Sequence, residues 1–127
     1  MDTKFGEYVK VKRMEKGVNL RKLAELLGIV PAYMSDIEKG RRYPPDKDKL
    51  YKIAEALHLT ESETNEMFDL AALAKENTVS PDLPEYIMGS EKARVALRIA
   101  RNINAGDEDW QKVIEMLEAK EKGDADN

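Results

Sequence analysis

The chain has 127 residues, of which 42% are hydrophobic, and this length suits one domain with its own core and a small appendage. It contains no cysteine and a single histidine, which excludes a disulfide framework and a thiolate zinc site, so we expect no metal or other cofactor. No apolar run approaches the roughly 20 residues of a membrane-spanning helix, and the N-terminus lacks the apolar core of a signal peptide. We therefore expect a cytoplasmic protein.

The net charge of −4 is unevenly divided along the chain. Residues 1–60 contain 13 Lys and Arg against 9 Asp and Glu, whereas residues 61–127 contain 8 against 16. The first half is therefore positive and the second half is acidic. Because an excess of this size is ordinary for a protein surface, charge alone does not indicate a nucleic-acid partner.

Two helical signals come first along the chain. A helix is expected over about residues 5–16, with Phe5 and Val9 among its apolar positions and Gly17 after its end. Asn19 then occupies an N-cap position, because its side chain can accept a free N–H of the next helix's first turn. The apolar residues that follow at i, i+3, i+4 and i+7 are Leu20, Leu23, Ala24 and Leu27. This spacing predicts an amphipathic helix.

Gly28 is placed to end that second helix, since glycine adopts the left-handed cap conformation without a steric cost. A third helix is expected after only two more residues, with Pro31 at its first position, where the missing N–H costs nothing. Met34 and Ile37 are its inward residues, and Gly40 stops it. Two short helices around a short, glycine-containing turn are typical of a helix-turn-helix. The alternative is an ordinary helical hairpin that happens to have a glycine in its turn.

This segment resembles the Xre group of lambdoid-repressor-like helix-turn-helix proteins. The matching residues within the motif are Leu23, Ala24, Gly28, Ile29, Tyr33, Met34, Ser35, Ile37, Glu38 and Gly40. The match extends on either side of the motif through Lys12, Arg13, Gly17, Leu50, Ile53, Ala54 and Leu57. The resemblance covers about the first half of the chain, and it implies a five-helix domain that binds DNA.

The resemblance also implies a structural ion pair. In this family the arginine that matches Arg13 pairs with the glutamate that matches Glu38. A guanidinium fork meets a carboxylate through two parallel hydrogen bonds, so this pair would tie the first helix to the third. A catalytic role for Glu38 is not expected. The chain offers no glycine-rich phosphate loop and no cluster of metal ligands, and we predict that it is not an enzyme.

The DNA interface that the resemblance implies is centred on the third helix. The residues expected to face base edges are Ala32, Tyr33, Ser35, Asp36 and Lys39. The residues expected to contact the DNA backbone are Asn19, Arg21, Lys22, Arg41 and Arg42. The sequence departs from the family's pattern in the first turn of the third helix, where no amide or guanidinium fork is present. The operator sequence therefore stays open, and a solvated loop is the alternative for the two consecutive arginines.

Two further helices complete the first half. Asp46 follows a pair of prolines and can cap a fourth helix. Thr60 and Glu63 form the pattern of a capping box, which predicts a fifth helix to about Lys75. The apolar stripe of the fourth helix consists of Leu50, Ile53, Ala54 and Leu57. Five helices agree with the domain that the resemblance implies.

The rest of the chain predicts a connector and a helical hairpin. Residues 76–89 contain prolines and a glycine, but their apolar residues are too numerous for a free linker, so we expect an ordered connector. Ser90 can cap a sixth helix and Asp107 a seventh. Residues 120–127 are polar and are expected to form a disordered tail.

The hairpin of residues 90–119 is too short to fold alone. Its apolar stripes therefore form a dimer interface or pack back on the first five helices, and we favour the dimer because two-fold operators require two-fold proteins. The residues expected at the dimer interface are Leu83, Tyr86, Ile87, Leu97, Ile103, Trp110, Val113, Ile114 and Leu117.

The sequence thus predicts an all-α fold with a five-helix, repressor-like helix-turn-helix domain over residues 1–75. An ordered, proline-containing connector (76–89), a C-terminal helical hairpin (90–119) and a disordered tail (120–127) are expected to follow. The predicted function is sequence-specific DNA-binding transcriptional regulation by a dimeric repressor, with a double-stranded DNA operator and a second copy of the chain as partners. A regulatory protein is a further partner that the sequence leaves open, and no membrane partner is expected. The alternative is a protein-binding module, antitoxin-like or a partner-regulated adaptor, that acts through the C-terminal half.

Overall fold

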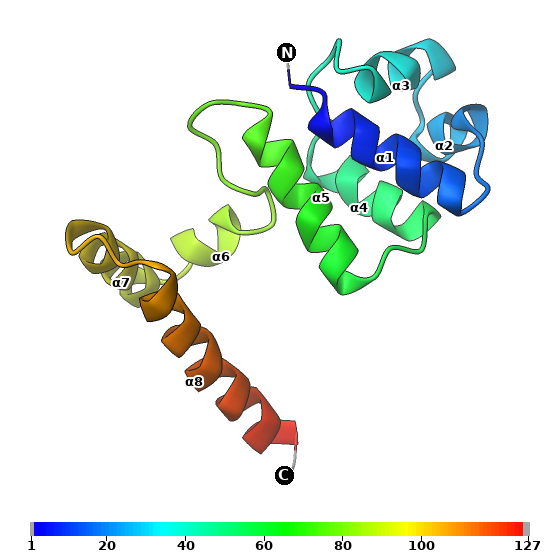
Figure 1. The fold of residues 1–127 in the computed structure, drawn as a ribbon. Coiled ribbons are helices and arrows are strands. Elements are labelled where there is room, and N and C mark those ends of the chain that lie inside the picture. Colours follow the sequence, from blue (N-terminus) through cyan, green and yellow to red (C-terminus); the bar gives the residue numbers. More distant parts are fainter. Residues whose placement is uncertain (1, 126–127) are drawn as a thin grey trace. The chain divides into compact units, whose positions relative to one another are not determined.

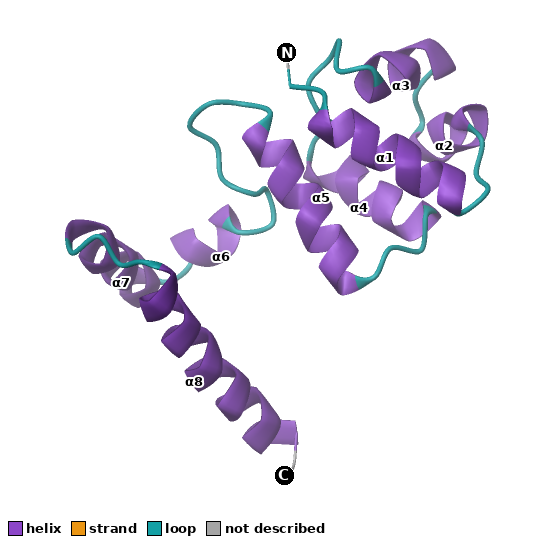
Figure 2. Ribbon diagram, viewed as in Figure 1, coloured by secondary structure: helices purple, strands orange, loops and turns teal. Residues whose placement is uncertain are grey.

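Helices form all the regular structure of the computed structural model, which describes residues 2–125 (Figure 1, Figure 2). Within this range the helices are α1 (Lys4–Glu15), α2 (Leu20–Leu27), α3 (Pro31–Glu38), α4 (Lys47–Ala56), α5 (Glu61–Leu73), α6 (Pro84–Met88), α7 (Glu91–Asn102) and α8 (Asp107–Ala125). The predicted all-α fold class is confirmed. None of these helices is both long and apolar enough to cross a membrane. The chain divides into a first unit, Met1–Tyr86, and a second unit, Ile87–Asn127.

The first unit has one hydrophobic core, to which α1 to α5 all contribute. In it α2 packs against α3 and α4, while α1 packs against α3 and α5. The buried apolar residues are Phe5, Val9, Leu23, Ala24, Leu27, Met34, Ile37, Leu50, Ile53, Leu57, Met67, Phe68 and Ala71. They include the inward positions that helical spacing predicts for α2, α3 and α4, apart from the half-buried Leu20 and Ala54. This core fixes the position of α3 against α1 and α2.

Side-chain caps begin several helices where the sequence predicts them. The Asn19 side chain accepts the N–H of Lys22 at 2.7 Å at the start of α2. The Asp46 carboxylate accepts the N–H of Lys49 at 3.1 Å at the start of α4. At the start of α5, Thr60 and Glu63 form both hydrogen bonds of a capping box, at 3.1 and 2.9 Å. Each bond satisfies a backbone N–H that the helix leaves free, so the caps help to set where these helices start.

Gly6 lets α1 approach the end of α3 more closely than any other residue would. A Cβ atom at this position would lie 2.4 Å from the carbonyl oxygen of Glu38 and 2.5 Å from that of Ile37. Both are backbone atoms, which cannot move aside as a flexible side chain can. The position of the third helix against the first therefore depends on the absence of a side chain at residue 6.

We expect Gly6→Ala to lower the free energy of unfolding by about 2 kcal/mol, the usual cost of overpacking a rigid site. Urea unfolding followed by circular dichroism measures this change. Gly123→Ala is the matched control, because Gly123 is also helical and a Cβ there meets no atom within 4 Å. Alanine in an open helical position usually stabilises a helix. Equal stability of the two variants would mean that α1 and α3 can separate without cost.

A second contact region fastens α1 to α5. The hydroxyl of Tyr8 donates a hydrogen bond of 3.0 Å to the carbonyl oxygen of Glu63, and the Lys12 ammonium lies 2.9 Å from the Glu63 carboxylate. The backbone N–H of Thr60 and then Lys12 lower the pKa of Glu63 to about 2. Glu63 therefore remains ionised at neutral pH while it serves both the cap of α5 and the contact with α1.

The connector predicted over residues 76–89 is ordered, but it is not a separate element. Ser80 is buried and its hydroxyl donates a hydrogen bond to the Asp69 carboxylate on α5. Lys47 forms an ion pair of 3.2 Å with Glu85. Residues up to Tyr86 belong to the first unit, and the connector contains the short helix α6, which the sequence analysis did not predict.

The second unit contains the hairpin of α7 and α8. Ser90 caps α7 as predicted, by accepting the N–H of Ala93 at 3.1 Å. The predicted cap of α8 by Asp107 is wrong: Asp107 is already helical, and the side chain of Asp109 instead accepts the N–H of Gly106 at 3.1 Å. An acidic side chain in the first turn can reach back to the residue before the helix, as in a capping box.

The prediction of a disordered tail is also wrong for residues 120–125, because α8 continues to Ala125. The segment before and within this stretch is rich in Glu, Lys, Ala, Met and Leu, which are strong helix formers. Gly123 costs a helix only about 1 kcal/mol and does not end it. Residues 126 and 127 of the predicted tail lie outside the described part of the chain.

Candidate nucleic-acid interface

The turn between α2 and α3 has the geometry that its sequence predicts. Gly28 adopts a left-handed conformation with φ of 73°, and the N–H of Ile29 returns to the carbonyl oxygen of Ala24 at 3.0 Å. Val30 precedes α3 without a side-chain cap, and Pro31 occupies the first turn. Because the turn has only three residues, α2 and α3 pack against each other at a fixed angle.

The ion pair of Arg13 and Glu38 is present. Nε of Arg13 donates to Oε2 of Glu38 at 2.8 Å, and Nη2 donates to Oε1 at 3.0 Å. The remaining terminal nitrogen, Nη1, donates to the carbonyl oxygen of Val18 at 3.1 Å. The Glu38 side chain is only 4% exposed, and its hydrogen bond raises the pKa of Arg13. The pair therefore joins α1 to the last residue of α3 in a nearly dry environment.

The outer face of α3 carries the residues that the sequence analysis expects to read bases. Ala32 and Lys39 are exposed, while Tyr33, Ser35 and Asp36 are half-buried. Met34 and Ile37 point into the core. The predicted residues thus share a surface that the first unit does not cover.

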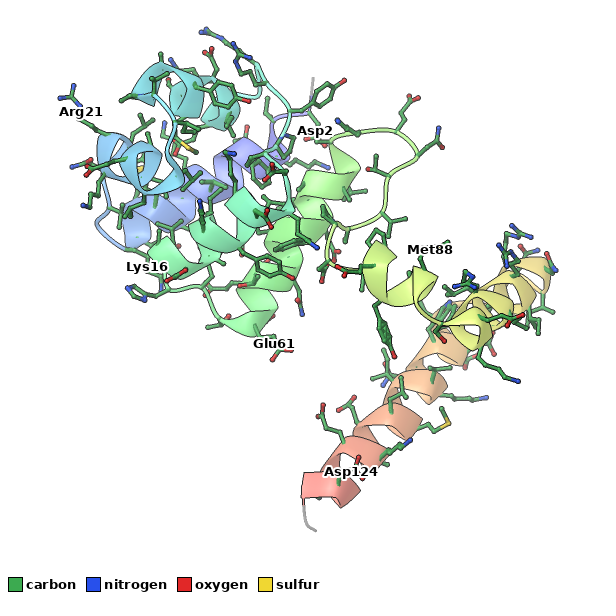
Figure 3. The ribbon with its side chains drawn as sticks, turned by 180° about the vertical axis from the view of Figure 1, so that it is seen from behind. Asp2, Lys16, Arg21, Glu61, Met88 and Asp124 are labelled. Carbon is green, nitrogen blue, oxygen red and sulfur yellow. The ribbon has the colours of Figure 1, made fainter. Side chains whose placement is uncertain are left out.

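The residues expected to contact the DNA backbone flank this surface. Arg21 and Lys22 are exposed in the first turn of α2, and Figure 3 shows the Arg21 side chain extending away from the helix. The side-chain oxygen of Asn19 accepts a hydrogen bond in the cap of α2, and its NH₂ group can donate to a phosphate. Arg41 and Arg42 are exposed after the end of α3.

The structure adds a cluster that the sequence analysis missed. The Arg42 guanidinium lies 4.6 Å from the centre of the Tyr33 ring, and its Nε is 3.8 Å from the Asp36 carboxylate. Nη1 of Arg41 is also 3.8 Å from that carboxylate. Gly40, with φ of 76°, turns the chain after α3 so that the arginines fold back beside the helix. The signal for this cluster in the sequence is the spacing of the opposite charges: Arg41 and Arg42 follow Asp36 by five and six residues, with the helix-ending Gly40 between them.

The residues predicted at a dimer interface are largely exposed in this chain. No residue of α7 is buried, and residues 107–124 of α8 are all exposed. An apolar groove runs between α7 and α8, and its lining includes Ile99, Ile103, Trp110 and Val113. Of the predicted residues in the connector, Leu83 and Tyr86 are exposed and Ile87 is half-buried.

A helix-ending glycine, a three-residue turn and a second helix with an uncovered outer face define a helix-turn-helix domain. Residues 9–63 match the protein-family model described as "Helix-turn-helix". This segment is therefore similar to the helix-turn-helix family, in agreement with the expected resemblance to the Xre group. The assignment agrees with the prediction that the chain is not an enzyme.

Individual proteins also resemble the chain. The ImmF control region 10 kDa protein of Bacillus phage phi105 is 41% identical over 56 residues, a match that spans 44% of this chain and 61% of the phage protein. Among solved structures, the clp gene regulator ClgR from C. glutamicum is 28% identical, over 60% of this chain and 94% of ClgR, with a TM-score of 0.45. One chain in a solved complex of SinR protein and SinI protein is 19% identical. The match spans 93% of this chain and 98% of that chain, with a TM-score of 0.46.

Proposed function

We propose that this chain is a cytoplasmic, sequence-specific DNA-binding transcriptional regulator that acts as a dimeric repressor. The observation that carries the proposal is the uncovered outer face of α3, with exposed cationic residues at both ends of the motif. A recognition helix with this exposure fits the major groove, where base pairs present distinct patterns of donors and acceptors. The named phage relative is a control-region protein, which supports the same class of function.

On this proposal, one set of residues contacts the phosphates and another set contacts the bases. Arg21, Lys22 and Arg41 neutralise phosphates on either side of the groove, together with the free N–H groups at the start of α2. The outer face of α3 reads the bases. Ala32 can contact a thymine methyl group, and Ser35 and Lys39 can hydrogen-bond to base edges or to phosphates.

A search for the operator tests the DNA-binding part of the proposal. The full-length protein is mixed with the DNA that flanks its own gene, and DNase protection locates any bound site. Protection of an inverted repeat is the expected result, since a two-fold dimer binds a two-fold site. Absence of binding to any duplex at low salt, where electrostatic attraction is strongest, would contradict the proposal.

The salt dependence of binding is expected to report the phosphate contacts. Arg41→Ala should weaken binding to all sequences and reduce the slope of log K against log salt concentration by about one unit, because one phosphate contact is lost. Fluorescence anisotropy over a salt series measures the slope. Lys52→Ala is the control, because Lys52 is exposed on α4, away from the proposed interface. An unchanged slope for the Arg41 variant would remove this residue from the interface.

The second unit supports the dimer part of the proposal. Many of its apolar residues are exposed within the unit as the structure describes it, and a second copy would cover them. Charge complementarity favours this occupant: α7 carries four basic residues and one acidic residue, whereas α8 carries seven acidic and three basic residues. In a two-fold dimer, α7 of one copy can lie beside α8 of the other, and opposite charges then face each other.

A protein-binding module is the second candidate function. The apolar groove between α7 and α8 contains Trp110, and large aromatic residues often anchor protein interfaces. An amphipathic helix of another protein would fit such a groove as well as a second copy does. A chain that stays monomeric and binds no duplex DNA would favour this candidate, whereas self-association together with operator binding favours the regulator.

A further inference from the structure

The recognition helix lacks an obvious group for reading guanine. Guanine is usually read through O6 and N7 by a guanidinium fork or an ammonium group. The first turn of α3, which normally approaches the bases most closely, contributes Pro31 and Ala32 to the surface, and neither has such a group. Lys39 lies at the opposite end of the helix. Any fork at the base-reading end of α3 must therefore come from outside the helix.

Arg42 provides a fork at that end. The chain folds back after Gly40 and brings the Arg42 guanidinium to 4.6 Å from the centre of the Tyr33 ring, which belongs to the first turn of α3. Tyr33 is half-buried and packs against the core, so the ring forms a fixed platform. A guanidinium stacked on an aromatic ring keeps its plane and exposes its edges.

Asp36 holds the other side of the same guanidinium. Its carboxylate lies 3.8 Å from Nε of Arg42, a distance at which the charges attract but no hydrogen bond is formed. The Nε edge is thereby directed towards the protein, and the Nη1 and Nη2 edge is left for a ligand. The Arg42 side chain is 53% exposed, so this edge can be reached from solvent.

We propose that Arg42 reads a guanine in the operator through two parallel hydrogen bonds, with Tyr33 and Asp36 as its positioning residues. This inference rests on the proposed DNA-binding function. The two consecutive arginines then have different roles. Arg41, whose side chain is 69% exposed and stacks on no aromatic ring among the described residues, contacts phosphate, whereas Arg42 contacts a base. The inference also gives Asp36 a role other than direct contact with the DNA.

Asp36 also raises the selectivity of the site. Its carboxylate repels phosphates and attracts both arginines, so it weakens binding to DNA of any sequence. At the right sequence, the guanine contact of Arg42 compensates for this loss. Asp36→Asn should therefore strengthen binding to random duplex DNA and weaken the discrimination between the operator and random DNA.

In vitro selection from a random duplex library with the full-length protein tests the inference. The wild-type protein should select a motif with a guanine in each half-site. Arg42→Lys keeps the charge but loses the fork, and the preference for that guanine should fall roughly tenfold to a hundredfold, while the salt dependence of binding is unchanged. Lys52→Ala, at an exposed residue of α4 that is not among the proposed interface residues, is the control and should select the wild-type motif.

The other outcomes separate this inference from the proposed function. If the wild type selects a motif and Arg42→Lys selects the same one with equal stringency, Arg42 does not read a base, although DNA binding stands. If Arg42→Lys relaxes the motif but Asp36→Asn leaves the discrimination ratio unchanged, Asp36 is not a positioning residue. If the wild type binds no duplex, the proposed function and this inference fail together.

Discussion

Glu38→Ala is expected to destabilise the first unit by about 3 kcal/mol. The change removes a carboxylate that accepts two hydrogen bonds from Arg13, and it leaves that guanidinium partly buried without its counter-charge. A charge in such a site cannot be released by deprotonation, because arginine stays protonated. The cost is therefore much larger than that of breaking an exposed ion pair, which is usually below 1 kcal/mol.

Urea unfolding of the full-length protein measures this cost. The signal should be far-ultraviolet circular dichroism, because the helices of the first unit contribute to it directly, whereas Trp110, the only tryptophan, lies in the second unit. Glu25→Ala on α2 is the matched control, since Glu25 is exposed and should change stability by less than about 0.5 kcal/mol. A similarly small loss for the Glu38 variant would show that the pair contributes no more than surface charges do.

The same ion pair shows why part of the interface could be predicted from the sequence. Arg13 and Glu38 are 25 residues apart, and no local pattern connects them. Resemblance to a family predicted the pair because the motif around them is specific. The helix caps were predictable for a different reason: the bonds of Asn19 and Asp46 form within three residues of the cap, so tertiary packing does not decide them.

Features that depend on tertiary packing or on a shift of one or two residues were not predicted. The contact of Arg42 with Tyr33 requires the backward turn at Gly40, and no local sequence pattern around either residue indicates this contact. The start of α8 cannot be located from residue type, because Asp107 and Asp109 are equally good capping residues and only backbone geometry decides between them. Residues 120–125 form the end of α8 although they are polar, because their helix propensity is high.

The double variant Trp110→Ala, Leu117→Ala is expected to be monomeric, to keep its helical content and to bind an operator about a hundredfold more weakly or worse. Both side chains are exposed on α8, at 38% and 55%, and lie on its apolar face. Removing them takes away the apolar area that a second copy would bury. A monomer then occupies one half-site at a time and loses the second contact, about 34 Å away along the DNA.

Light scattering, circular dichroism and fluorescence anisotropy with an operator duplex decide this prediction together. The matched control is Lys112→Ala, Glu115→Ala, because helical spacing places these two exposed residues on the opposite side of α8 from Trp110. The control should remain dimeric and should keep wild-type affinity. A wild-type protein that is monomeric at micromolar concentration would refute the dimer, and the exposed apolar face of α7 and α8 would then be assigned to a partner protein. A dimeric double variant would place the interface elsewhere in the chain, since the largest apolar side chain of this face would then contribute nothing to association.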